Sequence, residues 1–367
     1  MVNDLQHEVL QHLQALVGFD TRNPPRAIST GGIFDYLQQH LQGFEFDLVD
    51  HGAGAVSLLA VRGTPTVVFN VHLDTVPSSD QWSADPLVMR DGDDRVIGLG
   101  VCDIKGAAAA MLACAARTQG DVALLFSTDE EANDARCIAG FLARHGQRFS
   151  AAIIAEPTNC EAVLAHRGIA SVRVAFRGEA GHGSSAAAVS ASALHQALRW
   201  GNSALDQFAA LQGERFGGLT GLRYNIGRIE GGIKANVIAP STEVRLNFRP
   251  LPSTDLDQVH AQLRDAAAAM DIVPAEYEIT FRGPTLPAGD IAGAEDRRLR
   301  ARDLAEELDL PIGNAVDFWT EASLFSEAGL TAFVFGPGDI AQAHTADEWV
   351  LKSQLTAYAN HLMRLFQ

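Results

Sequence analysis

The chain alternates short apolar segments with longer stretches in which apolar residues recur at helical spacing. Apolar segments with the length of buried strands lie at 66–71, 122–126, 152–155 and 331–335. The stretches that we predict to be helices between and around them lie at 5–17, 32–41, 107–116, 294–308 and 351–366. Strands that alternate with helices are typical of a mostly parallel sheet with helices on both faces. The pattern therefore predicts an α/β fold.

From about residue 167 the apolar and polar positions alternate instead, as in strands with one solvent-exposed face. The elements predicted here are strands at 169–177, 224–229, 235–238, 243–248 and 277–282, and helices at 191–211 and 256–269. We interpret this part as a ferredoxin-like α/β sandwich inserted into the first domain. The expected domains are thus 1–166 together with 284–367, and the insertion 167–283.

Composition narrows the classes of partner that we expect. The chain has 367 residues, 47% of them hydrophobic, so it can bury a large core, and its formal net charge of −17 argues against nucleic acid and membrane surfaces as partners. Its four cysteines form no C-x-x-C pair, which favours reduced thiols over a disulfide framework. We see neither a signal-peptide pattern nor an apolar run of membrane-spanning length. The expected location is therefore the cytoplasm.

Residue types that bind metals follow the predicted strands or stand at a loop-to-helix junction: His72, Asp103, Glu131, Glu156 and His344. Ligands of open α/β sheets gather where the carboxyl ends of the strands meet. Nitrogen and oxygen donors without sulfur suit zinc, cobalt or manganese, and two imidazoles are too many for calcium. Each residue alone is more often an ordinary core or surface group. Five together exceed the needs of one tetrahedral zinc and predict two metals that share a carboxylate.

Two further acids complete this constellation. Asp74 lies two residues after His72, on the same side of an extended chain, and we predict that it orients the imidazole. Glu130 and Glu131 are adjacent, so their side chains point in opposite directions in an extended segment. One of the two is expected to bind metal, and the other is free to act as a general base on water. This chemistry is that of amide hydrolysis.

Five motifs, in the same order and over nearly the whole chain, resemble a di-zinc family. They are His72-Leu73-Asp74, Gly98-x-Gly100-x-x-Asp103-x-Lys105-Gly106, Asp129-Glu130-Glu131, Glu156-Pro157 and Ala343-His344. The family contains acetylornithine deacetylase, succinyl-diaminopimelate desuccinylase, aminoacylase and the glutamate-releasing type of carboxypeptidase.

The resemblance implies a role for each residue of the site. One metal is held by His72 and Glu156, the other by Glu131 and His344, and Asp103 bridges them. Glu130 is then the base, Asp74 orients His72, and the peptide bond Asp103–Ile104 is cis. The resemblance also implies that the inserted domain is a lid or dimerisation domain of a homodimer.

Three residues of the insertion match positions of the family that act on substrate. His182, in the glycine-rich Ala180-Gly181-His182-Gly183-Ser184, corresponds to a histidine that stabilises the oxyanion, often from the other subunit. Without the family it would be interpreted as a surface histidine. Asn236 and Arg249 correspond to substrate contacts, and a guanidinium can bind an α-carboxylate in bidentate fashion.

Within the family, the segments 336–344 and 320–322 resemble the acetylornithine deacetylase branch, while 21–26 and 99–109 are closer to deacetylases of N-acetylcitrulline. The implied activity is zinc- or cobalt-dependent release of acetate from an N-acetylated amino acid in arginine biosynthesis. N-acetylcitrulline is the expected substrate, and N-acetylornithine or a broader set of N-acyl amino acids is the alternative. We further hypothesise that Glu321 contacts the ammonium or ureido group of the substrate. A rival interpretation, a non-catalytic amino-acid-binding homologue, gives Glu130 no role.

Overall fold

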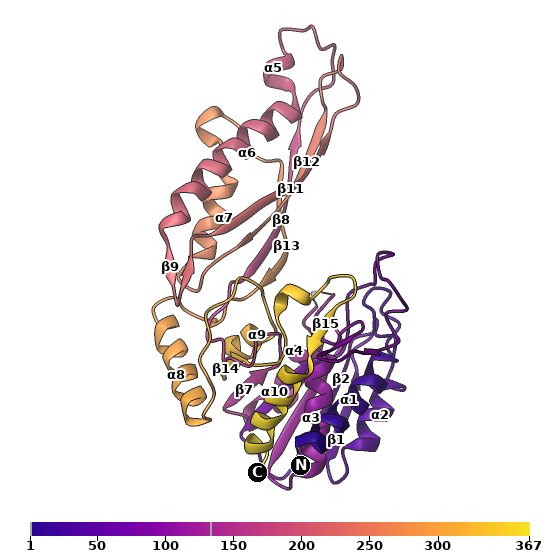
Figure 1. Ribbon diagram of the computed structural model, residues 1–367. Helices are drawn as coiled ribbons and strands as arrows, with labels where there is room; N and C mark the ends of the chain where they lie inside the picture. The colour runs from indigo at the N-terminus through magenta and orange to yellow at the C-terminus, as the bar shows by residue number, and fades with distance from the viewer. Residues whose placement is uncertain (1, 133) are drawn as a thin grey trace. The chain divides into compact units, whose positions relative to one another are not determined.

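The computed structural model describes residues 2–132 and 134–367, which form two compact units (Figure 1). The first unit consists of Met1–Leu164, Asp296–Asn314 and Thr320–Gln367, and the second of Ala165–Glu295 and Ala315–Trp319. Residues 165–166, 284–295 and 315–319 therefore belong to the second unit, whereas the sequence placed them with the catalytic domain. The reason is pairing near the junction, since His166 forms bridges with both Leu286 and Val316.

A six-stranded sheet forms the centre of the first unit. Its strands, in spatial order, are β1 Glu45–Asp50, β2 Val56–Arg62, β6 Val122–Ser127, β3 Val67–His72, β7 Ala151–Ile154 and β14 Thr331–Val334. The last four strands are parallel to one another, and β2 pairs antiparallel with both β1 and β6. The predicted α/β fold with a mostly parallel sheet is confirmed. His72 is the last residue of β3 and pairs with Ser127, so β3 and β6 end at the same level.

Helices cover both faces of this sheet. On one face, Phe69 and Val71 share a core with α1 Val2–Val17, α2 Ile33–His40, α3 Lys105–Arg117 and α10 Lys352–Leu365. Side chains alternate along a strand, so Val68, which is also fully buried, points to the opposite face. There α4 Arg136–His145 and α9 Ala322–Glu327 pack together, with the rings of Phe141 and Phe325 5.8 Å apart. Strand β3 is thus buried on both faces, as the unbroken apolar run predicts.

The second unit is an antiparallel sheet covered by two helices. Its strands are β11 Arg223–Gly231, β12 Ser241–Arg249, β8 Ile169–Arg177 and β13 Glu276–Gly283 in spatial order. Helices α6 Ala193–Ala210 and α7 Leu256–Arg264 pack beside it (Figure 1), around a core that includes Trp200 and Phe248. The predicted order of a ferredoxin-like sandwich is confirmed.

The predicted strand at 235–238 is wrong. The backbone N–H of Val237 donates to the carbonyl of Lys234 across 3.0 Å, which turns the chain. The N–H of Ile238 then donates to Gly181 across 2.9 Å, so this segment pairs with a loop and not with the sheet.

Short elements complete the structure. A small sheet in the first unit contains β4 Arg90–Asp91, β5 Arg95–Ile97 and β15 Trp349–Leu351. The remaining elements are α5 Ala188–Ala191, α8 Ala294–Glu307, the strand pair β9 Arg215–Phe216 and β10 Leu219–Thr220, and 3-10 turns at Gly146–Arg148, Leu211–Gly213, Ala268–Met270 and Ile340–Gln342. Among the residues described, we find no helix with the length and apolar character needed to span a membrane.

Candidate metal centre

The five predicted ligands all belong to the first unit, and three of them lie at or close after the ends of strands of its main sheet. His72 ends β3, Glu131 lies in the turn after β6, and Glu156 lies two residues after β7. The other two lie in loops: Asp103 in the turn before α3, and His344 after β14 and a 3-10 turn. Because β3, β6, β7 and β14 are parallel, their carboxyl ends meet at one edge of the sheet.

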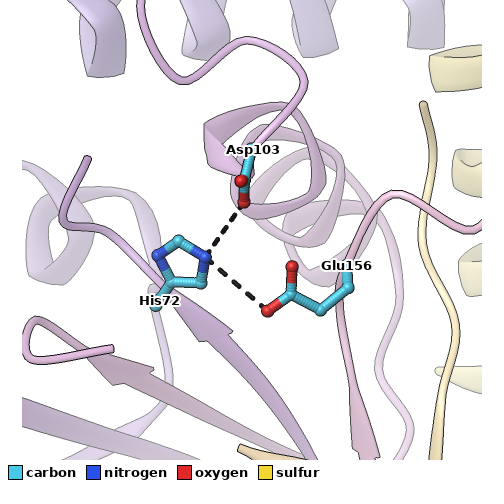
Figure 2. Close-up of side chains that lie close together, drawn as sticks. All are labelled: His72, Asp103 and Glu156. Carbon is cyan, nitrogen blue, oxygen red and sulfur yellow. Dashed lines mark hydrogen bonds and ion pairs between the residues drawn. The ribbon is translucent and has the colours of Figure 1, made fainter. Parts of the chain in front are cut away.

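The first group of ligand side chains is His72, Asp103 and Glu156 (Figure 2). Nε2 of His72 lies 3.2 Å from Oδ1 of Asp103 and 3.7 Å from Oε1 of Glu156. All three residues are buried, and one donor atom from each lies within 4.8 Å of the other two. One imidazole and two carboxylates at this spacing can surround a single cation.

The second group is Asp103, Glu131 and His344. Nε2 of His344 lies 3.3 Å from Oδ2 of Asp103 and 3.1 Å from Oε1 of Glu131. Asp103 therefore directs one carboxylate oxygen to each group. This arrangement supports the assignment of Asp103 as a bridging ligand.

The acidic groups of both sites lie close enough together that positive charge between them would stabilise their ionised forms. Burial and the charges of neighbouring acids raise the pKa of Glu130, Glu131 and Glu156. Burial also acts to raise the pKa of Asp103, but hydrogen bonds with the two imidazoles outweigh it and lower the pKa. Hydrogen bonds to Asp103 and Glu131 raise the pKa of His344 to about 11. Four carboxyl groups beside two imidazoles fit a pair of divalent cations, which would neutralise them.

Asp74 contacts one residue of each group, His72 in the first and Glu131 in the second. Nδ1 of His72 lies 3.0 Å from the backbone oxygen of Asp74 and 3.4 Å from its Oδ1. Nε2 is thereby directed towards the carboxylates, which is how acids orient metal-binding histidines. The Oδ2 atom of Asp74 accepts hydrogen bonds from Nδ2 of Asn23 at 3.0 Å and from the backbone N–H of Glu131 at 3.1 Å.

Glu130 lies in the same turn as Glu131 and is half-buried. Burial raises the pKa of its carboxyl group, and the charges of Glu131, Glu156 and Asp103 raise the pKa further. A carboxyl group with a raised pKa accepts a proton more readily than an ordinary one, which suits a general base.

The model of peptidase family M20/M25/M40 matches residues 68–367. The chain belongs to this family. It is 64% identical over 365 residues to N-acetyl-L-citrulline deacetylase of Xanthomonas campestris pv. campestris, and the match covers 99% of each chain. It is 30% identical over 312 residues to acetylornithine deacetylase of Salmonella paratyphi B, covering 82% of this chain and 76% of that one.

A solved structure of the M20 family has the same fold. The YXEP protein of Bacillus subtilis, described as a dinuclear metal-binding peptidase, aligns with a TM-score of 0.64 and 15% identity, over 99% of this chain and 97% of that one. The family resemblance drawn from the motifs is confirmed, and with it the enzyme class: the chain is a metal-dependent amidohydrolase. The cis peptide bond Asp103–Ile104 is also confirmed.

Glu321 occupies a buried position in this M20-family enzyme. Glu321 is only 1% exposed. Its Oε2 atom accepts hydrogen bonds from Nδ2 of Asn70 at 2.7 Å and from Oγ of Ser127 at 2.8 Å. These contacts link β3 to β6. Direct contact with a substrate side chain stays a prediction, and the surroundings favour a role inside the protein.

His182, Asn236 and Arg249 lie in the second unit, apart in sequence from the metal ligands. His182 is exposed, and its Nδ1 lies 2.7 Å from Oγ of Ser184. The N–H of Gly183 donates to the carbonyl of Asn236 at 2.9 Å, so His182 and Asn236 lie on paired segments. Arg249 ends β12, and partial burial lowers the pKa of its guanidinium.

Two buried charged residues had no assigned role in the sequence analysis. Nζ of Lys105 donates to the carbonyl of Phe19 at 2.9 Å, and burial lowers the pKa of Lys105 to about 8. Glu348 accepts backbone hydrogen bonds from the loop that carries Asp103. No motif marks Glu348, because its partners are about 250 residues away along the chain.

Proposed function

We propose that this M20-family enzyme hydrolyses N-acetyl-L-citrulline to acetate and L-citrulline. Two ligand groups that share Asp103, with Glu130 beside them, carry the proposal of amide hydrolysis. The choice of substrate rests on 64% identity, along 99% of both chains, to an N-acetyl-L-citrulline deacetylase. N-acetylornithine is the second candidate, because a relative with 30% identity is an acetylornithine deacetylase.

Two zinc or cobalt ions are the cofactors that we assign to the site. His72 and Glu156 would hold one and Glu131 and His344 the other, with Asp103 shared between them. The distances of 3.1–3.7 Å from the imidazole nitrogens to the carboxylate oxygens support this division. When bound, such ions act as Lewis acids towards a carbonyl and lower the pKa of water.

The protein side chains then move the protons. Glu130 takes a proton from the attacking water and delivers it to the leaving nitrogen, so that one water and one amide become a carboxylic acid and an amine. Asp74 keeps the imidazole of His72 directed at the acids by holding its Nδ1 side.

The second unit supplies the groups for substrate binding in this proposal. Ser184 contacts Nδ1 of His182, so Nε2 is the nitrogen offered to an oxyanion. Asn236 lies on the paired segment, and the Arg249 guanidinium would bind the α-carboxylate.

We propose further that the enzyme is a homodimer of the cytoplasm that acts in arginine biosynthesis. β11 is an edge strand of the second sheet, and Ile229 on it and Leu198 and Leu205 on α6 are exposed, which supports assembly through this unit. All four cysteines are free thiols in the structure, which supports a reducing compartment.

A substrate panel tests the proposal. The enzyme is loaded with zinc or cobalt and supplied with N-acetylcitrulline, N-acetylornithine and N-succinyl-diaminopimelate. We expect kcat/KM to be highest for N-acetylcitrulline, by about tenfold or more over N-acetylornithine. A preference for the succinylated substrate, or no amide hydrolysis by metal-loaded protein, would overturn it.

A further inference from the structure

Glu348 is a buried acid whose side chain accepts hydrogen bonds from three backbone N–H groups of one loop. Its Oε1 accepts hydrogen bonds from Cys102 at 2.7 Å and from Asp103 at 2.9 Å, and its Oε2 accepts one from Gly100 at 2.9 Å. Glu348 is only 2% exposed. Three hydrogen bonds from one loop to one side chain restrict the positions that the loop can take.

The loop has little freedom to adopt another shape. Gly100 has φ +81°, a conformation that other residues rarely adopt, and a Cβ there would lie 2.8 Å from Cγ2 of Thr75. Cys102 is fully buried, so its N–H donates to Glu348 and not to bulk water. Glu348 is therefore the group that satisfies these donors.

The same carboxylate joins two segments that carry metal ligands. Asp103 directs its two oxygens to the two ligand groups, while its own backbone N–H is bound by Glu348. His344 lies four residues before Glu348 on the segment that leads into β15. β15 pairs with β5 through Trp349 and Ile97, and the N–H of Gly98 donates to the Glu348 carbonyl at 3.1 Å.

We propose that Glu348 is a positioning residue that sets the bridging carboxylate of Asp103 relative to His344. The proposal rests on the metal centre described above and adds a residue to it. Because Asp103 serves both groups, a shift of its backbone changes both metal sites at once. Small displacements of catalytic groups reduce rate strongly, whereas substrate binding elsewhere is unaffected.

The test compares Glu348→Gln with the wild type and with Glu45→Gln, a change of an exposed acid at the start of β1. The substitution Glu348→Gln keeps the length of the side chain but turns one acceptor oxygen into an NH₂ group facing an N–H donor. We expect this variant to bind both cobalt ions about 10–100-fold more weakly, by titration calorimetry on metal-free protein. The visible absorption spectrum of the cobalt-loaded variant should change, and kcat should fall with KM within about threefold. Glu45→Gln should match the wild type in every readout.

Circular dichroism and thermal unfolding show whether the Glu348→Gln variant is folded, and Glu348→Asp gives a second comparison. Asp is shorter by one carbon, so it should also weaken both metal sites. Unchanged cobalt affinities and spectrum in the Glu348→Gln variant, or a loss of thermal stability alone, would overturn the proposal. Weakening of only one metal would also overturn it, because the shared ligand would then not be the group that moves. The cobalt titration uses no substrate, so a wild type that prefers another substrate would contradict the proposed function alone.

Discussion

Asn70 donates a hydrogen bond from Nδ2 to Oε2 of Glu321 across 2.7 Å, although the two residues are 251 positions apart in the chain. The same oxygen accepts from Ser127 at 2.8 Å. Asn70 stands two residues before His72, and Ser127 is the pairing partner of His72 in the sheet. Glu321 thus holds together the ends of β3 and β6 next to the first group of metal ligands.

This contact predicts that Glu321→Gln leaves the choice of substrate unchanged. Gln can still accept from Asn70 and Ser127, so the ratio of kcat/KM for N-acetylcitrulline and N-acetylornithine should stay within about twofold of the wild type. Glu321→Leu removes the acceptor and leaves buried donors, and should lower the free energy of unfolding by about 1–3 kcal/mol. A ratio that changes strongly in the Gln variant would restore the hypothesis that Glu321 contacts the substrate.

The role of Glu130 as the base predicts a loss of rate without a loss of metal. Glu130→Gln should lower kcat by about 10²–10⁴-fold, the usual contribution of a positioned acid–base. Metal content by mass spectrometry should stay at the wild-type value. Glu131→Gln is the matched control from the same turn, and it should lose metal because Glu131 contacts His344. Loss of metal in both variants would show that Glu130 is also a ligand.

The shared carboxylate predicts unequal effects of two ligand substitutions on metal content. Asp103→Ala should reduce binding of both ions, because each oxygen of Asp103 lies in a different group. Glu156→Ala should reduce binding of one ion only, since Glu156 belongs to the first group alone. The readout is the number of ions retained per chain after dialysis. Equal losses in the two variants would argue against a bridge.

His12 predicts a pH dependence of stability in the first unit. Burial, followed by the charge of His40, lowers the pKa of His12 from 6.5 to about 4, and its Nδ1 lies 2.8 Å from the Tyr36 hydroxyl. The folded state therefore disfavours the protonated ring of His12. The stability that neutral His12 contributes is present above pH 6.5 and is lost as the pH falls from 6.5 through about 4.

The variant for this measurement is His12→Gln, which keeps a hydrogen-bonding group for Tyr36 but does not titrate. Thermal unfolding followed by circular dichroism should show a steeper fall of Tm with decreasing pH in the wild type than in the variant. Titration of the metal ligands affects both proteins equally and cancels in the difference. Parallel curves would contradict the lowered pKa of His12.

The hydrophobic pattern was sufficient for the four parallel strands of the main sheet, because these strands are buried and form unbroken apolar runs. The candidate ligands could be named for the same reason, since four of them stand soon after such a run or at the start of a helix. His344 is the exception, because a 3-10 turn separates it from β14. The prediction at 235–238 failed because its apolar residues pair with the loop around Gly181 and not with the sheet. The local pattern of apolar residues does not show whether a segment pairs with a loop or with a sheet.

Polar contacts between residues far apart in the chain could not be predicted from the sequence pattern. Glu348 binds a loop that lies 245 positions earlier at Asp103, and Glu321 binds Asn70 across a similar separation. A lone acid next to a predicted helix or strand carries no periodic signal, and its burial follows only from the tertiary fold. The junction near Leu286 was misplaced for a related reason, since its pairing with His166 spans the whole insertion.

The most direct test of the account is the position of the metals relative to Asp103. Crystals of the zinc-loaded enzyme, measured with X-rays on both sides of the zinc absorption edge, locate each ion independently of the protein atoms. We predict two anomalous peaks about 3.5–4 Å apart, one beside His72 and Glu156 and one beside Glu131 and His344, with an oxygen of Asp103 on each. A single peak in the fully loaded enzyme, or an Asp103 that touches only one ion, would contradict the account.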